Sequence, residues 1–201
     1  MVETAPITVC TAHIPPRREL LNRAVNSVMR QTLLPENHLI SVDYARRGGP
    51  GTLDAAVYGA QTKWIAILDD DDEFLPDHLA TLYSVALETD ADLVFSHFRY
   101  TSTGDGGHLE RFRGVPFDNA NPRQTTNVFL VKTDLAIEVG GFSGGFDTMG
   151  FERDNAGNRI GYDFHFVKKL AAIDAKIVHT PEVTWIYHVE HGSTLGMPNR
   201  W

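Results

Sequence analysis

Residues 64–78, WIAILDDDDEFLPDH, constrain the fold of this chain more than any other stretch. The first five residues are apolar and rich in β-branched and aromatic side chains, as in a strand that is buried on both faces of a parallel sheet. Five carboxylates follow at once, from Asp69 to Glu73. Adjacent carboxylates repel one another, and a divalent cation is their natural partner. Because α/β sheets bind ligands beyond the carboxyl ends of their strands, this acidic run predicts a binding site for Mg²⁺ or Mn²⁺ and a diphosphate.

A solvated acidic loop is the alternative interpretation of this run. In that case Asp72 or Asp77 would only cap the helix that follows. For an arbitrary acidic run this alternative would be preferred, but the position directly after a buried strand favours the ligand site.

Strands and helices alternate along the chain. The predicted strands are 7–10, 38–43, 64–68, 92–95, 127–132, 176–179 and 183–188, and the predicted helices are 17–31, 52–62, 77–88, 133–139 and 161–172. Such alternation predicts a mostly parallel α/β sheet with right-handed crossovers. A chain of 201 residues is long enough for one well-buried core, so we expect a single domain.

Three segments are predicted to be irregular because of their glycine content. The segment 46–51 has the sequence RRGGPG and is expected to be a loop, and 96–113 is expected to form a hairpin. The segment 142–158 holds four glycines among few apolar residues, and we expect it to close over a site.

Charge and composition exclude several classes of protein. The net charge of -8 has the wrong sign for sequence-independent binding of nucleic acid, so a nucleic-acid partner is not expected. The single cysteine, Cys10, excludes an internal disulfide and is expected to be buried. No apolar run has the length of a membrane span and the N-terminus lacks a signal pattern, so we expect a soluble, cytoplasmic protein.

The chain resembles glycosyltransferase family 2, a group of nucleotide-sugar transferases with the GT-A fold. The resemblance covers nearly the whole chain and rests on the order of these segments: ITVCTAHIPPR, SVMRQT, SVD, WIAILDDDDEFLPDHL, VGGF, GYDFHFVKKL and WIYHVEHGST. The most specific segment joins an apolar strand to Asp-x-Asp-Asp and a Pro-x-x-Leu helix start. The resemblance implies a Rossmann-like GT-A domain over 1–201, with a nucleotide-binding half at 1–95 and an acceptor-side half at 96–201.

The resemblance also implies which residues bind the donor. Thr11 and Ala12 would lie beside the base or ribose, Asp43 would bind the base, and Asp70 would lie near the ribose. The expected donor is a nucleoside-diphosphate sugar, with a UDP-sugar preferred.

Some positions depart from the family pattern. Family members often carry a second acid where this chain has Tyr44, and many have an Arg-Asn pair near the positions of Leu53 and Asp54. Arg46 or Arg47 is a candidate to replace the lost basic contact.

The metal ligands implied by the resemblance are Asp69 and Asp71, with Asp71 as the direct ligand of Mn²⁺ or Mg²⁺. A C-terminal histidine often joins them in the family, and His191 fits that role better than His188. A cation there stabilises the charge that develops on the departing diphosphate.

The resemblance assigns Asp163 as the catalytic base of an inverting transfer, where the usual preceding Glu is replaced by Tyr162. The base removes the proton of an acceptor hydroxyl as it attacks the anomeric carbon. From the residues alone, Asp163 would be interpreted as a helix cap. Asp147 and Glu152 are the alternative bases.

Three other functions remain open from the sequence. A nucleotidyltransferase also combines an α/β sheet with acidic metal ligands, but the segment 11–17, TAHIPPR, lacks the usual glycine-rich phosphate loop. A degenerate binding module would retain the nucleotide-sugar site without catalysis, as Tyr44, Asp54 and Tyr162 suggest. A calcium-binding structural domain would need a different spacing of acids.

Overall fold

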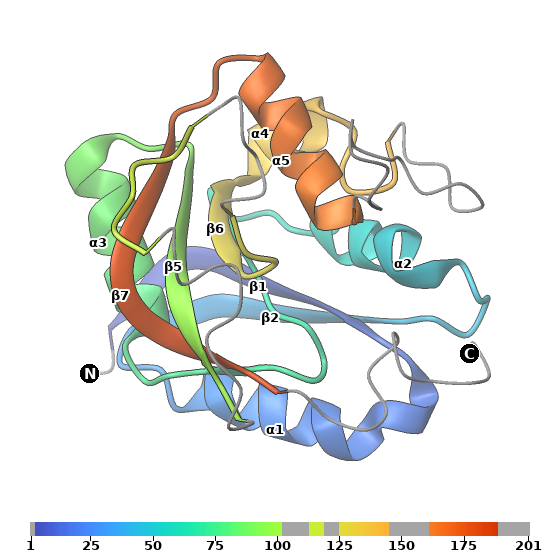
Figure 1. Ribbon diagram of the computed structural model, residues 1–201. Coiled ribbons are helices and arrows are strands. Elements are labelled where there is room, and N and C mark those ends of the chain that lie inside the picture. Colours follow the sequence, from blue (N-terminus) through green and yellow to red (C-terminus); the bar gives the residue numbers. More distant parts are fainter. Residues whose placement is uncertain (1–2, 102–112, 119–124, 145–160, 189–201) are drawn as a thin grey trace.

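The computed structural model describes residues 3–101, 113–118, 125–144 and 161–188, which form one seven-stranded mixed sheet with helices on both faces (Figure 1). The strands are β1 (Thr4–His13), β2 (Leu34–Val42), β3 (Trp64–Ile67), β4 (Glu73–Phe74), β5 (Leu93–Tyr100), β6 (Phe129–Lys132) and β7 (Ile177–Tyr187). The helices are α1 (Arg18–Met29), α2 (Gly48–Val57), α3 (His78–Thr89), α4 (Thr133–Glu138) and α5 (Tyr162–Ala172), and a short 3-10 helix, η1 (Pro15–Arg17), precedes α1.

The order of strands in the sheet is β2-β1-β3-β6-β5-β7-β4. The long pairings, β1 with β2 and β5 with β7, are parallel, as is the pairing of β1 with β3. The short strand β6 runs antiparallel to both β3 and β5, and β4 runs antiparallel to β7. Consequently β1, β2, β3, β5 and β7 all end at the same edge of the sheet, which is where the acidic residues follow β3.

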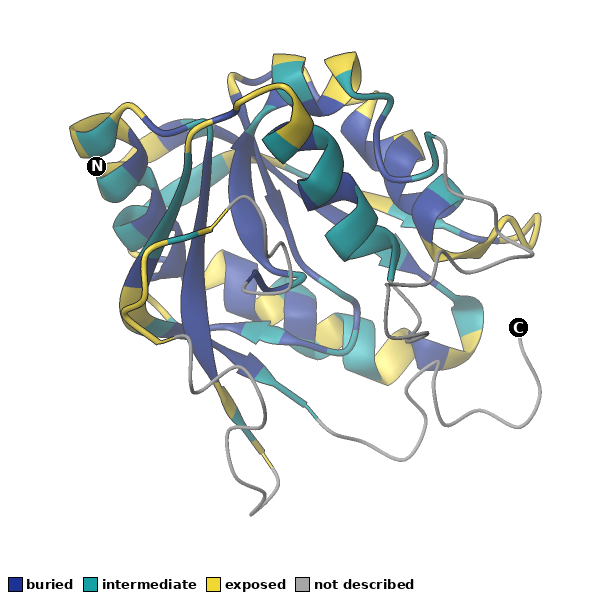
Figure 2. Ribbon diagram, turned by 45° about the horizontal axis from the view of Figure 1, so that its top comes forward, coloured by how far each residue is buried: buried dark blue, intermediate teal, exposed yellow. Residues whose placement is uncertain are grey.

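The core has two halves because side chains alternate along each strand. In β3, Trp64 and Ala66 pack with α1 and α3 on one face, whereas Ile65 and Ile67 pack with α2, α4 and α5 on the other. Figure 2 shows the central strands buried and the outward faces of the helices exposed. Burial on both faces explains the continuous apolar run of this strand.

The predicted mostly parallel α/β sheet flanked by helices is confirmed, with local differences. The predicted loop 46–51 was wrong from Gly48 onward, because α2 already begins at that residue. The carboxylate of Asp43 accepts hydrogen bonds from the amides of Arg47 and Gly48, and these bonds start the helix where the glycines predicted a loop.

Three strands also differ from the prediction. The strands predicted at 176–179 and 183–188 are one continuous strand, β7, which follows β5 with an irregular register around His97. The strand β5 is longer than predicted, because residues 96–100, the start of the predicted hairpin, continue it beside β7. Residues 102–112 of that hairpin lie outside the described part. The sequence did not predict β4, because two residues are too few to show a periodicity.

Candidate active site

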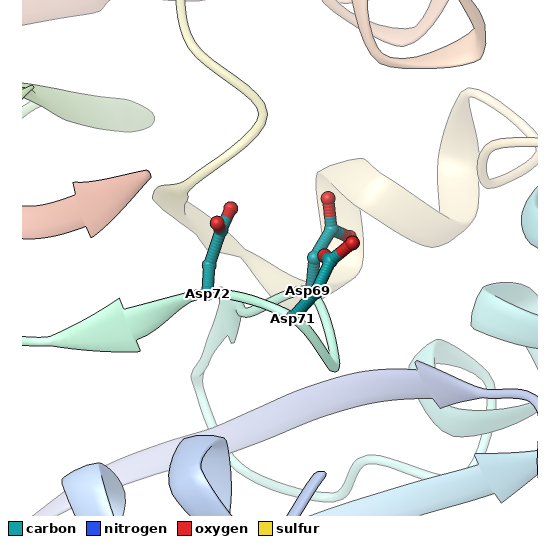
Figure 3. Close-up of side chains that lie close together, drawn as sticks. All are labelled: Asp69, Asp71 and Asp72. Atoms are coloured by element: carbon teal, nitrogen blue, oxygen red, sulfur yellow. The ribbon is translucent and has the colours of Figure 1, made fainter. Parts of the chain in front are cut away.

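The acidic residues form a cluster in the connection from β3 to β4 (Figure 3). Asp69, Asp71 and Asp72 each offer a carboxylate oxygen, and these atoms all lie within 4.8 Å of one another. The chain turns tightly here, since the amide of Asp72 donates to the carbonyl of Asp69 at 3.2 Å. The predicted ligands Asp69 and Asp71 therefore lie together, and Asp72 joins them.

Electrostatic repulsion and burial make this cluster unfavourable for negative charge. Burial raises the pKa of Asp69 to about 7, and the nearby charges of Asp71, Asp70 and Asp163 also raise it. Burial raises the pKa of Asp72 well above its ordinary value, with Asp69 and Asp71 adding to the effect. A bound cation would relieve this cost by favouring the charged carboxylates.

Asp72 has a free oxygen inside the cluster. The residue is 1% exposed, and its Oδ1 accepts a hydrogen bond from the amide of His188 at 3.1 Å. Its Oδ2 is buried and has no hydrogen-bond donor within bonding distance among the described residues. The side-chain amide of Asn127 is nevertheless near enough to favour the charged form of the Asp72 carboxylate. A buried carboxylate oxygen without a partner is energetically costly, and a bound cation would offset that cost.

Asp70 differs from the other acids because both of its oxygens are already bound. Its Oδ2 lies 2.8 Å from Nδ1 of His13, and its Oδ1 accepts a hydrogen bond of 2.8 Å from Arg17. The same arginine nitrogen lies 3.1 Å from Asp71. Asp70, expected near a ribose, is thus a buried anchor between β3 and the segment that follows β1.

Asn127 belongs to the site, although the sequence did not predict it. Its side-chain amide donates to Oδ2 of Asp69 at 2.6 Å, which favours the charged form of that carboxylate. The residue lies just before β6, and the antiparallel pairing of β6 with β3 brings it to the acidic turn. The sequence contains no local signal for the contact between Asn127 and Asp69, because it depends on the pairing of two strands that are distant in the chain.

The residues expected to bind the nucleotide lie at the ends of β1 and β2. The hydroxyl of Thr11 is 3.0 Å from Nε2 of His38, and Thr11 is buried. Ala12, the next residue of β1, is partly exposed. Asp43 is 3% exposed and accepts two backbone hydrogen bonds, whereas the adjacent Tyr44 is 78% exposed. Their roles in binding the nucleotide stay predictions.

Asp163 lies in the first turn of α5, close enough to the acidic cluster to raise the pKa of Asp69. Burial raises the pKa of Asp163 itself, while amides of the first helical turn favour its charged form. Burial also raises the pKa of the Tyr162 hydroxyl, and the charges of Asp69 and Asp163 add to this effect. Tyr162, which replaces the usual Glu, therefore brings a neutral phenol to the same site.

The histidine expected to complete the metal site, His191, lies outside the described residues, as do Asp147 and Glu152. His188 is within them. Its Nε2 lies 3.3 Å from the carboxylate of Glu73, and its amide bonds to Asp72. Of the predicted lid at 142–158, only 142–144 is described, and those residues form a turn.

The architecture just described is that of the GT-A nucleotide-sugar transferases. It is similar to the structure of S. aureus TarS 1-349 in complex with UDP, with a TM-score of 0.67 and 10% sequence identity, over 92% of this chain and 61% of that chain. The complex of the same TarS fragment with UDP-GlcNAc gives a TM-score of 0.68 and 11% identity, over 93% of this chain and 59% of that chain. At such identity the likeness shows the fold alone.

The family follows from the sequence. The model of "Glycosyl transferase family 2" matches residues 35–149, more than half of the chain, and the chain therefore belongs to that family. It is also similar to the succinoglycan biosynthesis protein ExoO of Rhizobium meliloti (strain 1021), with 28% identity over 168 residues. That match covers 79% of this chain and 47% of ExoO, so the chain spans about half the length of this relative.

Proposed function

We propose that this chain acts as a metal-dependent, inverting glycosyltransferase that moves a sugar from a nucleoside-diphosphate sugar to an acceptor hydroxyl. The observation that carries the proposal is the juxtaposition of three carboxylates, Asp69, Asp71 and Asp72, with the carboxylate of Asp163 at one edge of the sheet. Membership of glycosyl transferase family 2 supports the same reaction class. The preferred donor is a UDP-sugar, because similarly folded TarS structures are complexes with UDP and UDP-GlcNAc.

The described residues fit a divalent cation. Three carboxylate oxygens lie within 4.8 Å of one another, and one of them belongs to the residue with an unpartnered buried oxygen, Asp72. Hard oxygen donors of this kind suit Mg²⁺ or Mn²⁺. Asp69, Asp71 and Asp72 would hold the ion, with His188 or His191 as candidates for a further ligand. When bound, the ion would neutralise charge on the diphosphate leaving group.

The residues of the chain divide the reaction between them. Asp163 would accept the proton of the acceptor hydroxyl as its oxygen attacks the anomeric carbon, while the bond from that carbon to the diphosphate breaks on the opposite side. Its raised pKa brings this base closer to neutral pH, which strengthens proton transfer. Thr11, Ala12 and Asp43 would hold the nucleoside.

A second candidate is a nucleotide-sugar-binding module without catalysis. It is favoured by two observations: the oxygens of Asp43 already accept backbone hydrogen bonds, and Tyr162 stands where many relatives have Glu. Such a module would bind the donor and never turn it over.

The decisive experiment compares binding with turnover. A panel of nucleotide sugars is screened by thermal shift with and without Mn²⁺, because a ligand that binds only the folded protein raises the unfolding midpoint. The donor with the largest shift is then assayed for hydrolysis, with water as the acceptor. The proposal predicts metal-dependent binding of the donor and slow hydrolysis, which Asp163→Asn slows by roughly 100-fold or more. Binding without turnover would favour the module, and no binding of any nucleotide sugar would exclude both.

A further inference from the structure

Asp54 of α2 has a structural role that its sequence position does not indicate. Its carboxylate is 4% exposed and accepts hydrogen bonds from the amides of Phe142 at 2.6 Å and Ser143 at 2.9 Å, and from the Ser143 hydroxyl. These residues form the turn that follows α4. Asp54 therefore joins α2 to a segment 88 residues further along the chain.

Lys169 of α5 also binds this turn. Its ammonium donates to the carbonyls of Gly141 and Gly144, the latter at 2.9 Å. Burial lowers the pKa of Lys169, and the negative charge of Asp54 opposes that effect by favouring the charged ammonium. We call Asp54, Lys169 and the turn 140–144 between them the clamp.

The clamp has no room for a side chain at two of its glycines, Gly141 and Gly144. Gly141 has a φ of +61°, and a Cβ there would lie 2.3 Å from Oδ1 of Asp54. A Cβ on Gly144 would lie 2.3 Å from the carbonyl oxygen of Gly140. The carboxylate of Asp54 can therefore approach this turn so closely only because residue 141 is a glycine.

The clamp contacts the first turn of α5, which carries Asp163. Nε2 of His165 lies 3.3 Å from the carbonyl oxygen of Gly144, and the amide of His165 bonds to Gly161 at 3.0 Å. The ring of Phe142 packs edge-on against Tyr162, with 6.1 Å between the ring centroids. Residues on both sides of Asp163 are thus attached to the clamped turn.

We propose that Asp54 and Lys169 are positioning residues that fix the catalytic carboxylate of Asp163 against the acidic cluster. This inference rests on the proposed function. Neither side chain touches the reacting atoms. They act through the turn 140–144, which ties α5 to α2 and so fixes the direction from which the base meets the acceptor. A small displacement of a reacting group is enough to slow a reaction strongly.

The test uses Asp54→Asn and Lys169→Met in the full chain, with Asp90→Asn and Lys168→Met as matched controls. Asp90 carries an exposed carboxylate and has a left-handed φ of +51°. Asparagine adopts this conformation as readily as aspartate, so Asp90→Asn should not strain the backbone. Lys168 is the neighbouring lysine of the same helix. Donor hydrolysis with Mn²⁺ is measured per folded molecule, and donor affinity by calorimetry. We expect kcat to fall roughly 10-fold or more in both clamp variants, with KM and donor affinity within about twofold of the unmodified protein.

Two further measurements separate positioning from stability. Lys169→Arg keeps the charge and should recover much of the lost kcat. Hydrogen exchange of the amides from 162 to 166, measured without any ligand, should be faster in the clamp variants than in the controls. Unchanged kcat per folded molecule together with unchanged exchange would overturn the proposal. If the unmodified protein neither binds nor hydrolyses a donor, the proposed function fails, and the exchange measurement still decides whether the clamp holds the first turn of α5.

Discussion

At the scale of single residues, the four consecutive aspartates have different environments although the sequence makes them look alike. Asp70 is bound by His13 and Arg17, and Asp72 by the amide of His188. Asp69 accepts from Asn127. These partners lie on β1, in η1, directly after β7 and before β6, so the environments of these three carboxylates depend on tertiary contacts.

The first prediction concerns Asp163. Asp163→Asn keeps the size of the side chain and removes its ability to accept a proton, so kcat should fall by roughly 100-fold or more. Donor affinity and the unfolding midpoint should change little, because the residue is not among the metal ligands. Steady-state hydrolysis and calorimetry measure the two effects. A variant that retained full kcat would exclude Asp163 as the base and would return attention to Asp147 and Glu152.

The second prediction concerns Asp70. Asp70→Asn removes one of the carboxylates that face the buried Arg17 and leaves that of Asp71, 3.1 Å away. Breaking the buried ion pair with Asp70 should cost about 3 kcal/mol of unfolding free energy. Urea unfolding measures the loss, and Asp90→Asn is the exposed control. A cost no larger than that of the control would show that the Arg17 contact to Asp71 is sufficient, contrary to the anchoring role assigned here.

At the scale of elements, the start of α5 shows a close packing that the sequence did not predict. The N-cap residue is Gly161, and Asp163 lies in the first turn of the helix. Gly161 precedes the helix, and a Cβ built on it would lie 2.2 Å from Oδ1 of Asp163. The glycine leaves room for the carboxylate. Its φ of -70° is accessible to any residue, so the requirement for glycine is one of space.

The third prediction follows from that contact. Gly161→Ala should displace the carboxylate of Asp163 and lower kcat by roughly 10-fold or more, while donor affinity is retained. Gly51→Ala is the control, since a Cβ there would meet its nearest neighbour at an ordinary 3.5 Å. Equal kcat in the two variants would mean that the carboxylate moves aside without loss of function.

The secondary structure was predicted best where periodicity is strong. The helices α3, α4 and α5 and the strand β3 lie within a few residues of their predicted bounds. The helix α4 ends at Glu138, one residue before its predicted end, and Gly140 and Gly141 beyond it both have positive φ values. The start of α2 was missed because the glycines at this position predict a loop. The hydrogen bonds that begin the helix instead come from the amides of Arg47 and Gly48 to the carboxylate of Asp43.

At the scale of the whole molecule, the acidic cluster makes stability depend on pH and on metal. In the unfolded chain the carboxyl groups ionise near pH 4, whereas burial raises the pKa of folded Asp69 to about 7. Between these values the folded state binds more protons than the unfolded state, so the contribution of Asp69 to stability falls as the pH rises from about 4 to about 7. The raised pKa values of Asp71 and Asp72 act in the same direction.

The fourth prediction is tested by thermal unfolding at pH 5 and pH 8. Without metal, the unfolding midpoint of the unmodified protein should fall between these values by more than that of Asp69→Asn, because the variant lacks one titrating group. Mn²⁺ should reduce the fall, since the cation replaces the protons that the cluster loses. A steeper fall in the variant, or no effect of Mn²⁺ at pH 8, would contradict the assignment of the cluster as a cation site.

Among the helices that the structure describes, none combines the length and the apolar composition of a membrane span.

The whole-molecule arrangement that matters for function is the shared direction of β1, β2, β3, β5 and β7. It gathers the ends of these strands at one edge, and it places Asp43 of one connection and the acidic cluster of another on the same side of the sheet.

The sequence by itself determined the order of strands and helices, the buried strand in front of the acidic run, and the family to which these segments belong. Those features are local, because hydrophobic periodicity and short motifs depend on neighbouring residues. Only the tertiary structure decided which carboxylates lie together, that Asn127 and the amide of His188 join them, and that Asp54 and Lys169 meet around one turn. Such contacts join residues dozens of positions apart, and strand pairing and helix packing bring them together without leaving a local pattern in the sequence.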